Sequence, residues 1–213
     1  MCSDLNLFHL AFDRDWETKI YEKMIGMSDF RDIHIAPHTL KVAAMFAVMS
    51  RMKESQKCDL LTKMKIYNGE EVIERGRVKK IDVKDLREEF EREGMQGIST
   101  RFIMKSIDAA LSDSENDTIT PISMMKALIS QVKEQILDAS FRSECFDIIQ
   151  KIVRDEYLKI LVTIQVRLSF FFCNSISNST ICCKRFCVVK IGFKNTSCLF
   201  FISRNKCLCN FVL

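Results

Sequence analysis

One arginine in this sequence stands where it could contact a phosphate. Arg101 follows two glycines, Gly94 and Gly97, and a serine, Ser99, that can cap the N-terminus of a helix. Apolar residues at helical spacing predict that helix: Ile103, Ile107, Ala110 and Leu111. Arg101 then lies in the first turn, where the helix dipole makes a cation unfavourable unless an anion is near. We interpret Arg101 as a candidate phosphate-sensing residue; alternatively, it reaches solvent or a neighbouring carboxylate.

The sequence holds no complete set of catalytic residues. A phosphoryl-transfer enzyme binds phosphates with a backbone cradle or lysine, and Mg²⁺ with carboxylates. The chain has no G-x-x-x-x-G-K-[ST] loop, no glycine-rich kinase loop and no H-R-D motif, and Asp29-Phe30 is followed by Arg31 instead of glycine. Its serines also lack a supporting arrangement of histidine and aspartate. We therefore assign no catalytic residue.

The spacing of histidine and cysteine does not indicate a metal site. His34 and His38 stand four residues apart, but Pro37 lies between them in what should be the first turn of a helix. No pair of cysteines in the C-terminal part has the C-x-x-C spacing of structural zinc sites. We therefore expect no metal ligands.

The residues before Leu161 predict an all-α bundle with little strand. Residues 40–52 are apolar nearly all round, which marks a central buried helix. Asp13 or Asp15 can cap a first helix, and its predicted buried side carries Trp16, Ile20, Met24 and Met27. Later helices are expected to begin near Asp82, Ser99, Thr120-Pro121 and Ser140, and the charged residues 70–80 to form a loop or weak hairpin.

The composition changes after Leu161. The chain holds 25 basic and 28 acidic residues up to that point, but seven basic and no acidic residues beyond it. Seven of the ten cysteines and eight of the sixteen phenylalanines also lie there, without helical periodicity. We interpret residues 162–213 as a disordered or non-native tail, translated out of frame.

The same features bear on location. Basic residues interrupt every apolar run of the tail short of the roughly 18 residues that a membrane span requires. Cysteines are few and widely spaced before Leu161, and the N-terminus shows no signal-peptide pattern. We expect a cytoplasmic protein that binds neither membrane nor nucleic acid.

Four segments, in order, resemble the bacterial PrkA family of serine protein kinases: residues 19–25, 34–46, 61–70 and 93–102. PrkA-type proteins are much longer, with an AAA+ ATPase core containing Walker A and B motifs, a helical lid and a C-terminal kinase-like region. The resemblance runs from about Phe12 to Leu161 and covers the lid and the helices after it. It implies that this chain is a fragment, inactive by itself, of an ATP-dependent serine/threonine protein kinase.

The resemblance also gives the arginine a role. In the AAA+ architecture, Gly97-Ile98-Ser99-Thr100-Arg101 resembles the sensor-2 motif, whose arginine lies near the terminal phosphates of the nucleotide. Arg101 is then the nucleotide-sensing residue, with Gly94, Gly97 and Ser99 as supporting turn and cap. ATP and Mg²⁺ are implied as cofactors of the complete family protein, with none for this chain alone.

The resulting division has four parts: residues 1–11 outside the family, a lid over 12–137, a linker helix over 138–161 and the tail over 162–213. The expected partners are the missing AAA+ core and kinase-like region, and the protein substrate is unknown. An alternative function is a free-standing helical module that binds a protein partner through an apolar face and uses no nucleotide.

We predict that the purified chain neither hydrolyses ATP nor phosphorylates protein, because it lacks a phosphate loop and carboxylates for Mg²⁺. A phosphate-release assay with Mg²⁺ and ATP measures this. Turnover that persists after the chain is separated from contaminating ATPases would contradict the prediction.

Overall fold

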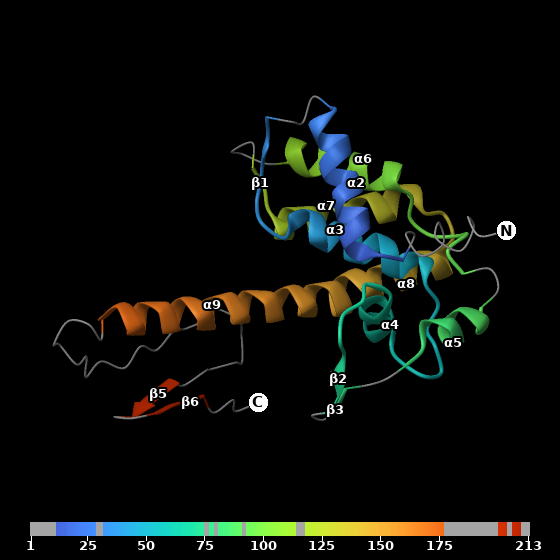
Figure 1. Cartoon of the computed structure of the whole chain (residues 1–213). Helices are drawn as coiled ribbons and strands as arrows, with labels where there is room; N and C mark the ends of the chain where they lie inside the picture. Colours follow the sequence, from blue (N-terminus) through green and yellow to red (C-terminus); the bar gives the residue numbers. More distant parts are fainter. Residues whose placement is uncertain are drawn as a thin grey trace. The chain divides into compact units, whose positions relative to one another are not determined.

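The described part of the chain is mostly helical, as predicted (Figure 1). The computed structural model describes residues 12–28, 32–74, 77–78, 81–90, 93–113, 118–176, 200–203 and 206–209. The elements in chain order are α2 (Arg14–Gly26), β1 (His34–Ile35), α3 (Thr39–Arg51), α4 (Leu60–Tyr67), β2 (Ile73–Glu74), β3 (Arg77–Val78), α5 (Val83–Glu88), α6 (Thr100–Ser112), β4 (Thr118–Ile119), α7 (Pro121–Gln135), α8 (Ala139–Asp147), the π-helical segment η1 (Ile148–Val153), α9 (Arg154–Ile176), β5 (Phe200–Ser203) and β6 (Lys206–Cys209). The chain divides into two units, Met1–Leu161 and Val162–Leu213.

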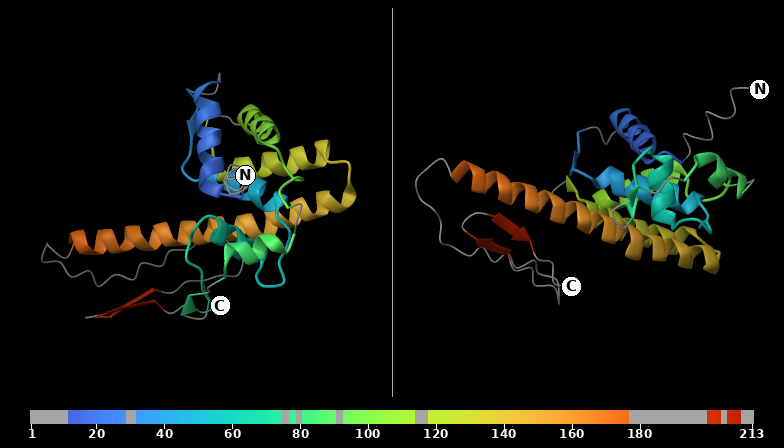
Figure 2. Two further views of the ribbon diagram at one scale, coloured as in Figure 1. Left: turned by 45° about the vertical axis from the view of Figure 1, so that its right-hand side comes forward. Right: turned by 60° about the horizontal axis from the view of Figure 1, so that its bottom comes forward.

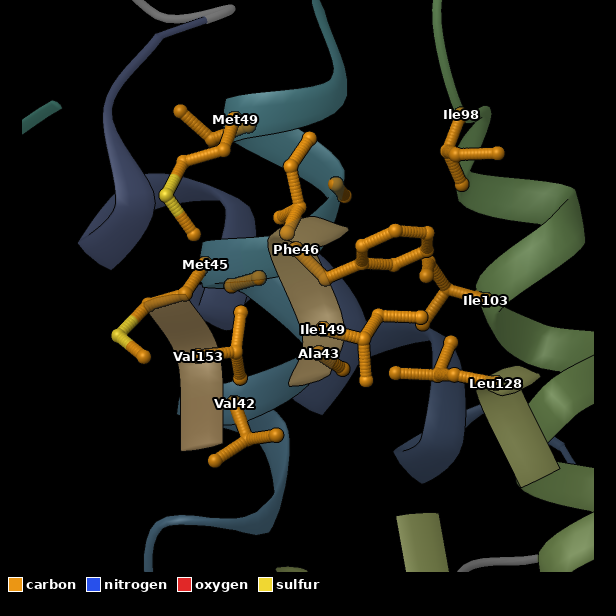
Figure 3. Packing of buried hydrophobic residues seen from close by; sticks show 14 of the residues in the cluster. Val42, Ala43, Met45, Phe46, Met49, Ile98, Ile103, Leu128, Ile149 and Val153 are labelled. Atoms are coloured by element: carbon orange, nitrogen blue, oxygen red, sulfur yellow. The ribbon is translucent and has the colours of Figure 1, made fainter. Parts of the chain in front are cut away.

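Helix α3 is the centre of the first unit. Its residues 42–50 are all buried, and it contacts α2, α4, α6, α7, α8 and η1. Helices α2, α3, α6 and α7 lie together in every view (Figures 1 and 2). Figure 3 shows the Phe46 ring of α3 beside Ile103 of α6, with Leu128 of α7 and Ile149 of η1 close by. The predicted central helix is therefore confirmed.

The start of α3 differs from the prediction. Strand β1 pairs in parallel with β4, and the Ala36 N–H donates to the Ile119 carbonyl at 2.9 Å. The Thr39 N–H in turn donates to the Ala36 carbonyl at 3.2 Å, and His38 has a left-handed backbone with φ of 68°. Because the paired strand holds this turn, α3 begins at Thr39, and Pro37 lies before the first turn instead of within it.

Helix α2 buries a different side from the predicted one. Asp13 caps it by accepting the Trp16 N–H, as expected. However, Trp16, Met24 and Met27 are 42%, 38% and 77% exposed. The buried side instead carries Arg14, Glu17, Tyr21 and Ile25. Polar side chains can occupy a buried face when their hydrogen bonds and charges are paired, and these are.

Several local predictions hold. Asp82 caps α5 through the Lys84 N–H, and Thr120 and Ser123 form a capping box at the start of α7. Strands β2 and β3 pair antiparallel, which confirms the weak hairpin. The helix expected to open at Ser140 begins one residue earlier, at Ala139, because the Asp138 side chain caps it by accepting the Ser140 N–H.

The last helix is longer than predicted. Helix α9 continues through Leu161 to Ile176, whereas the sequence predicted a helix that ends at Leu161. No proline or glycine occurs between these positions, so nothing in the backbone stops the helix. Strands β5 and β6 pair antiparallel. The remaining residues of the predicted tail, and residues 1–11, lie outside the described part of the chain.

Among the described residues, no helix combines the length and the apolar character that crossing a membrane requires.

A buried ion pair fastens α4 to the segment that leads into Gly94. Lys63 Nζ lies 2.6 Å from Glu93 Oε1, and the two side chains are 0% and 4% exposed. Lys63 also donates to the Lys53 carbonyl at 3.0 Å, and the Lys53 N–H donates to Glu93 at 2.6 Å. The Lys63 ammonium lies 4.9 Å from the centroid of the Phe90 ring. The chain before Gly94 is thereby held against α4.

We predict that Lys63→Met lowers the free energy of unfolding by about 3–5 kcal/mol, because it leaves the buried Glu93 carboxylate without its cation. Lys57→Met is the matched control: Lys57 pairs with Asp85 at 3.1 Å, but both side chains are about half exposed. Its loss should cost no more than about 1 kcal/mol. Urea unfolding of both variants measures the difference, and equal costs would refute the importance of the buried pair.

Candidate functional site

The candidate site is the N-terminus of α6. Ser99 has an extended backbone, and its hydroxyl oxygen accepts the Phe102 N–H at 3.3 Å. Arg101 is the second residue of the helix and is exposed, and the first turn contains no acidic residue. Within the described residues Arg101 has no hydrogen-bond or ion-pair partner. Of the alternatives that the sequence left open, the structure thus shows the side chain in solvent, where a ligand can reach it.

The turn before α6 depends on glycine at two positions. Gly94 and Gly97 have φ of +88° and +124°, backbone angles that residues other than glycine rarely adopt. A Cβ atom on Gly97 would lie 2.7 Å from the Ser50 carbonyl oxygen and 2.9 Å from Arg51 Cα. The Gly94 N–H donates to the Arg51 carbonyl at 3.1 Å. The turn therefore runs directly against the end of α3.

A buried charge pair supports this turn from α2 and α3. Arg51 donates two hydrogen bonds to the Glu17 carboxylate, from Nη1 at 3.0 Å and from Nη2 at 2.8 Å. Its Nε donates a third, to the Ile98 carbonyl at 3.0 Å. The Tyr21 hydroxyl donates to Glu17 Oε1 at 2.7 Å. The Glu17 and Arg51 side chains are 4% and 12% exposed.

The surroundings of Glu17 favour its charged form. Burial by itself would raise the pKa of Glu17, but the hydrogen bonds and positive charge of Arg51, with further hydrogen bonds from Tyr21 and Thr100, outweigh it and hold the pKa below its ordinary value. Burial and the nearby Glu17 carboxylate raise the pKa of Tyr21. Glu17 and Arg51 therefore form a true ion pair at neutral pH, and Tyr21 remains a hydroxyl donor.

Neither Glu17 nor Arg51 was predicted from the sequence. They are 34 positions apart. Glu17 lies in the first turn of α2 and Arg51 is the last residue of α3, and charged residues near helix ends are usually solvated. The available signal was Tyr21, one helical turn after Glu17, on a side of α2 that also carries Ile25. Among the described residues, no group of three or more His, Cys, Asp or Glu side chains is arranged to hold a metal ion. His34 and His38 belong to no such group.

Two family models match adjacent parts of the chain. Residues 10–59 match the PrkA AAA domain, and residues 61–181, more than half of the chain, match the PrkA serine protein kinase C-terminal domain. Arg101 lies in the second match, which also continues past Leu161. The chain thus shares sequence with the C-terminal domain of the family as well as with its AAA domain, whereas the sequence analysis expected the kinase-like region to be missing.

Curated relatives agree with these matches. The chain is 41% identical over 114 residues to the ATP-dependent protease PrkA of Bacillus subtilis (strain 168), a match covering 53% of this chain and 18% of that protein. It is 30% identical over 126 residues to the serine/threonine kinase YeaG of Escherichia coli (strain K12), covering 56% of this chain and 19% of the relative. No solved structure gives a significant match.

The chain spans less than a fifth of the length of these relatives. Their names carry two activities, proteolysis for one and phosphorylation for the other. The matched segments nevertheless follow one another in the chain and together cover residues 10–181 but for residue 60. The chain belongs to the PrkA family.

Proposed function

We propose that residues 12–137 act as the nucleotide-sensing lid of an ATP-dependent PrkA-type serine protein kinase, and that Arg101 contacts the terminal phosphates of the bound nucleotide. The observation that carries this proposal is the placement of Arg101. It is an exposed cation at the positive end of a helix, and within the described residues it has no acidic partner to offset the cost. A phosphate would offset that cost.

The rigidity of the turn supports the same function. A residue that senses a phosphate must be held close to its working position, because small displacements weaken a charge-assisted contact. The turn before α6 is fixed by Gly97 against α3, by the Ser99 cap and by the contact of Arg51 with Ile98. The exposed side chain of Arg101 thus extends from a backbone that these contacts hold in place.

The residues present fit one part of an ATP site. Arg101 and the N-terminus of α6 suit a phosphate, both by charge and by their unpaired N–H groups. The described residues offer no cluster of carboxylates for Mg²⁺. We therefore assign metal binding and the cradle for the nucleotide to the parts of the family protein that this chain does not cover, and assign no catalytic step to the chain alone.

The exposed apolar side of α2 supports a protein partner. It carries Trp16, Met24 and Met27, and α2 lies within residues 10–59, the segment that matches the AAA domain. We assign this side to contact with the rest of that domain. A second candidate function, the helical interaction module without nucleotide, is favoured by the same side chains, since an apolar surface also suits another protein.

We predict that Arg101→Ala slows ATP hydrolysis by about ten- to a hundred-fold, because a charge-assisted contact to phosphate contributes about 1.5–3 kcal/mol. The test protein is the full-length Bacillus subtilis relative carrying residues 12–137 of this chain in place of its own segment. Lys105→Ala, which removes an exposed cation one turn further along α6, should leave the rate nearly unchanged. In the isolated chain Arg101→Ala should leave the melting temperature unchanged or slightly higher.

Two results would count against the sensor role. Equal effects of Arg101→Ala and Lys105→Ala on the rate would show that only general surface charge matters. An unchanged rate together with a marked loss of stability in the isolated chain would make Arg101 a structural residue. If the rate is also insensitive to Trp16→Ser while that change abolishes binding of a separate protein, the interaction module is the better description.

A further inference from the structure

The buried pair of Glu17 and Arg51 contacts the chain on both sides of Ser99. Arg51 Nε donates to the carbonyl of Ile98 at 3.0 Å, while its other nitrogens hold Glu17. The Thr100 side chain, directly before Arg101, also helps to hold the pKa of the Glu17 carboxylate below its ordinary value. One guanidinium, itself held by the Glu17 carboxylate, therefore fixes the backbone that leads into α6.

Ser50 completes the hold on Ile98. The Ile98 N–H donates to Ser50 Oγ at 2.9 Å, and the Ser50 hydroxyl donates to the Ala47 carbonyl at 2.7 Å. The last turn of α3 thus binds both backbone groups of Ile98, the N–H through Ser50 and the carbonyl through Arg51. Ile98 is also 4% exposed. Since its polar groups have buried partners, this residue cannot turn without breaking hydrogen bonds shielded from water.

These contacts join segments that match different domains of the family. Glu17 and Arg51 lie within residues 10–59, the AAA match, and Ile98, Thr100 and Arg101 lie within residues 61–181, the C-terminal match. We propose that Glu17 and Arg51 are positioning residues for Arg101, through which the AAA-matched segment sets the position of the backbone that carries this arginine. The inference rests on the proposed nucleotide-sensing role of Arg101.

A second buried arginine, Arg14, forms ion pairs but has no described contact with the turn before α6. Arg14, also on α2, is 5% exposed in its side chain and pairs with Asp15 at 2.8 Å and Glu70 at 2.7 Å. Its contacts reach α2 and the end of α4, and none of those described involves α6. Arg14→Lys is therefore the matched control for Arg51→Lys, because both retain a buried cation while removing the geometry of the guanidinium.

The first measurement is amide hydrogen exchange of the 213-residue chain. Arg51→Lys retains a charge for Glu17 but cannot hold Glu17 and the Ile98 carbonyl in the same way. We expect the ratio of the exchange rate in residues 94–103 to the exchange rate in α7 to rise at least about tenfold. Losing a hydrogen bond to a charged group changes the equilibrium for local opening by a factor of this size. Arg14→Lys should leave this ratio unchanged. Thr100→Val, a milder change, should raise exchange at the start of α6 and serves if Arg51→Lys does not fold.

The second measurement is a double-mutant cycle for ATP hydrolysis in the full-length chimera described above. If Arg51 acts through Arg101, then Arg51→Lys slows hydrolysis, and Arg51→Lys with Arg101→Ala is no slower than Arg101→Ala alone. For Arg14→Lys, the factor by which the rate falls should be the same whether or not Arg101→Ala is present, so that the two effects multiply in the double variant. A residue that serves only stability would behave like Arg14.

The outcomes separate this inference from the proposed function. Local exchange that rises only near α6, with a non-additive cycle, supports the positioning role. The positioning role would be overturned if exchange in residues 94–103 is unchanged, or if it rises equally throughout the first unit. It would also be overturned if the effects of Arg51→Lys and Arg101→Ala on the rate multiply, even if Arg101→Ala itself slows hydrolysis. If Arg101→Ala has no effect on the rate, the proposed function fails and the positioning role in catalysis fails with it, while the exchange data report whether the pair holds the turn.

Discussion

The absence of a polar face on α3 is the constraint on which the rest of this structure depends. Residues 42–50 are buried without interruption, so the helix is stable only when other elements cover every side of it. Each large apolar side chain buried in this way contributes roughly 1.5–3 kcal/mol. Helices α2, α4, α6, α7 and α8, with η1, supply the cover. Those after α3 come from the segment that matches the C-terminal domain, while α2 and α3 come from the AAA match.

The boundary between the family models near residue 60 is therefore not a boundary between folding units. A chain separated there would expose Phe46 and its neighbours on one side and the apolar faces of α6 and α7 on the other. The structure places the change between compact units much later, at Leu161. In this chain, residues that match the AAA domain and residues that match the C-terminal domain stabilise one another by sharing a core.

The sequence predicts what is decided locally and misses what is decided across the chain. The all-round apolar character of α3 and the capping residues at Asp13, Asp82 and Thr120 follow from neighbouring residues alone. The buried side of α2 could not be predicted in this way, because two different sides of this helix carry residues at helical spacing. The apolar side with Trp16 and Met27 was the simpler choice, and the correct one becomes favourable only when Arg51 and other distant groups neutralise its polar side chains.

The candidate site divides in the same way. Gly97, Ser99 and Arg101 form a local pattern, and four segments in order were enough to indicate the family. Nothing near Arg101 in the sequence points to Glu17 or Arg51, since their contacts with the turn depend on how three helices pack. Helix α9 was cut short for a related reason: its composition changed at Leu161, but composition does not end a helix that contains no breaker.

The π-helical segment η1 has a consequence for the second half of the bundle. Cys145, Ile149, Val153 and Tyr157 recur every four residues and are all buried, at 0%, 1%, 0% and 8% exposure. In an uninterrupted α-helix such a repeat drifts by about 40° at each step, so the last residue would point about 120° away from the first. The wider turn of η1 takes up this drift. Because of this wider turn, the continuous helix formed by α8, η1 and α9 keeps the same side buried from Cys145 to Tyr157.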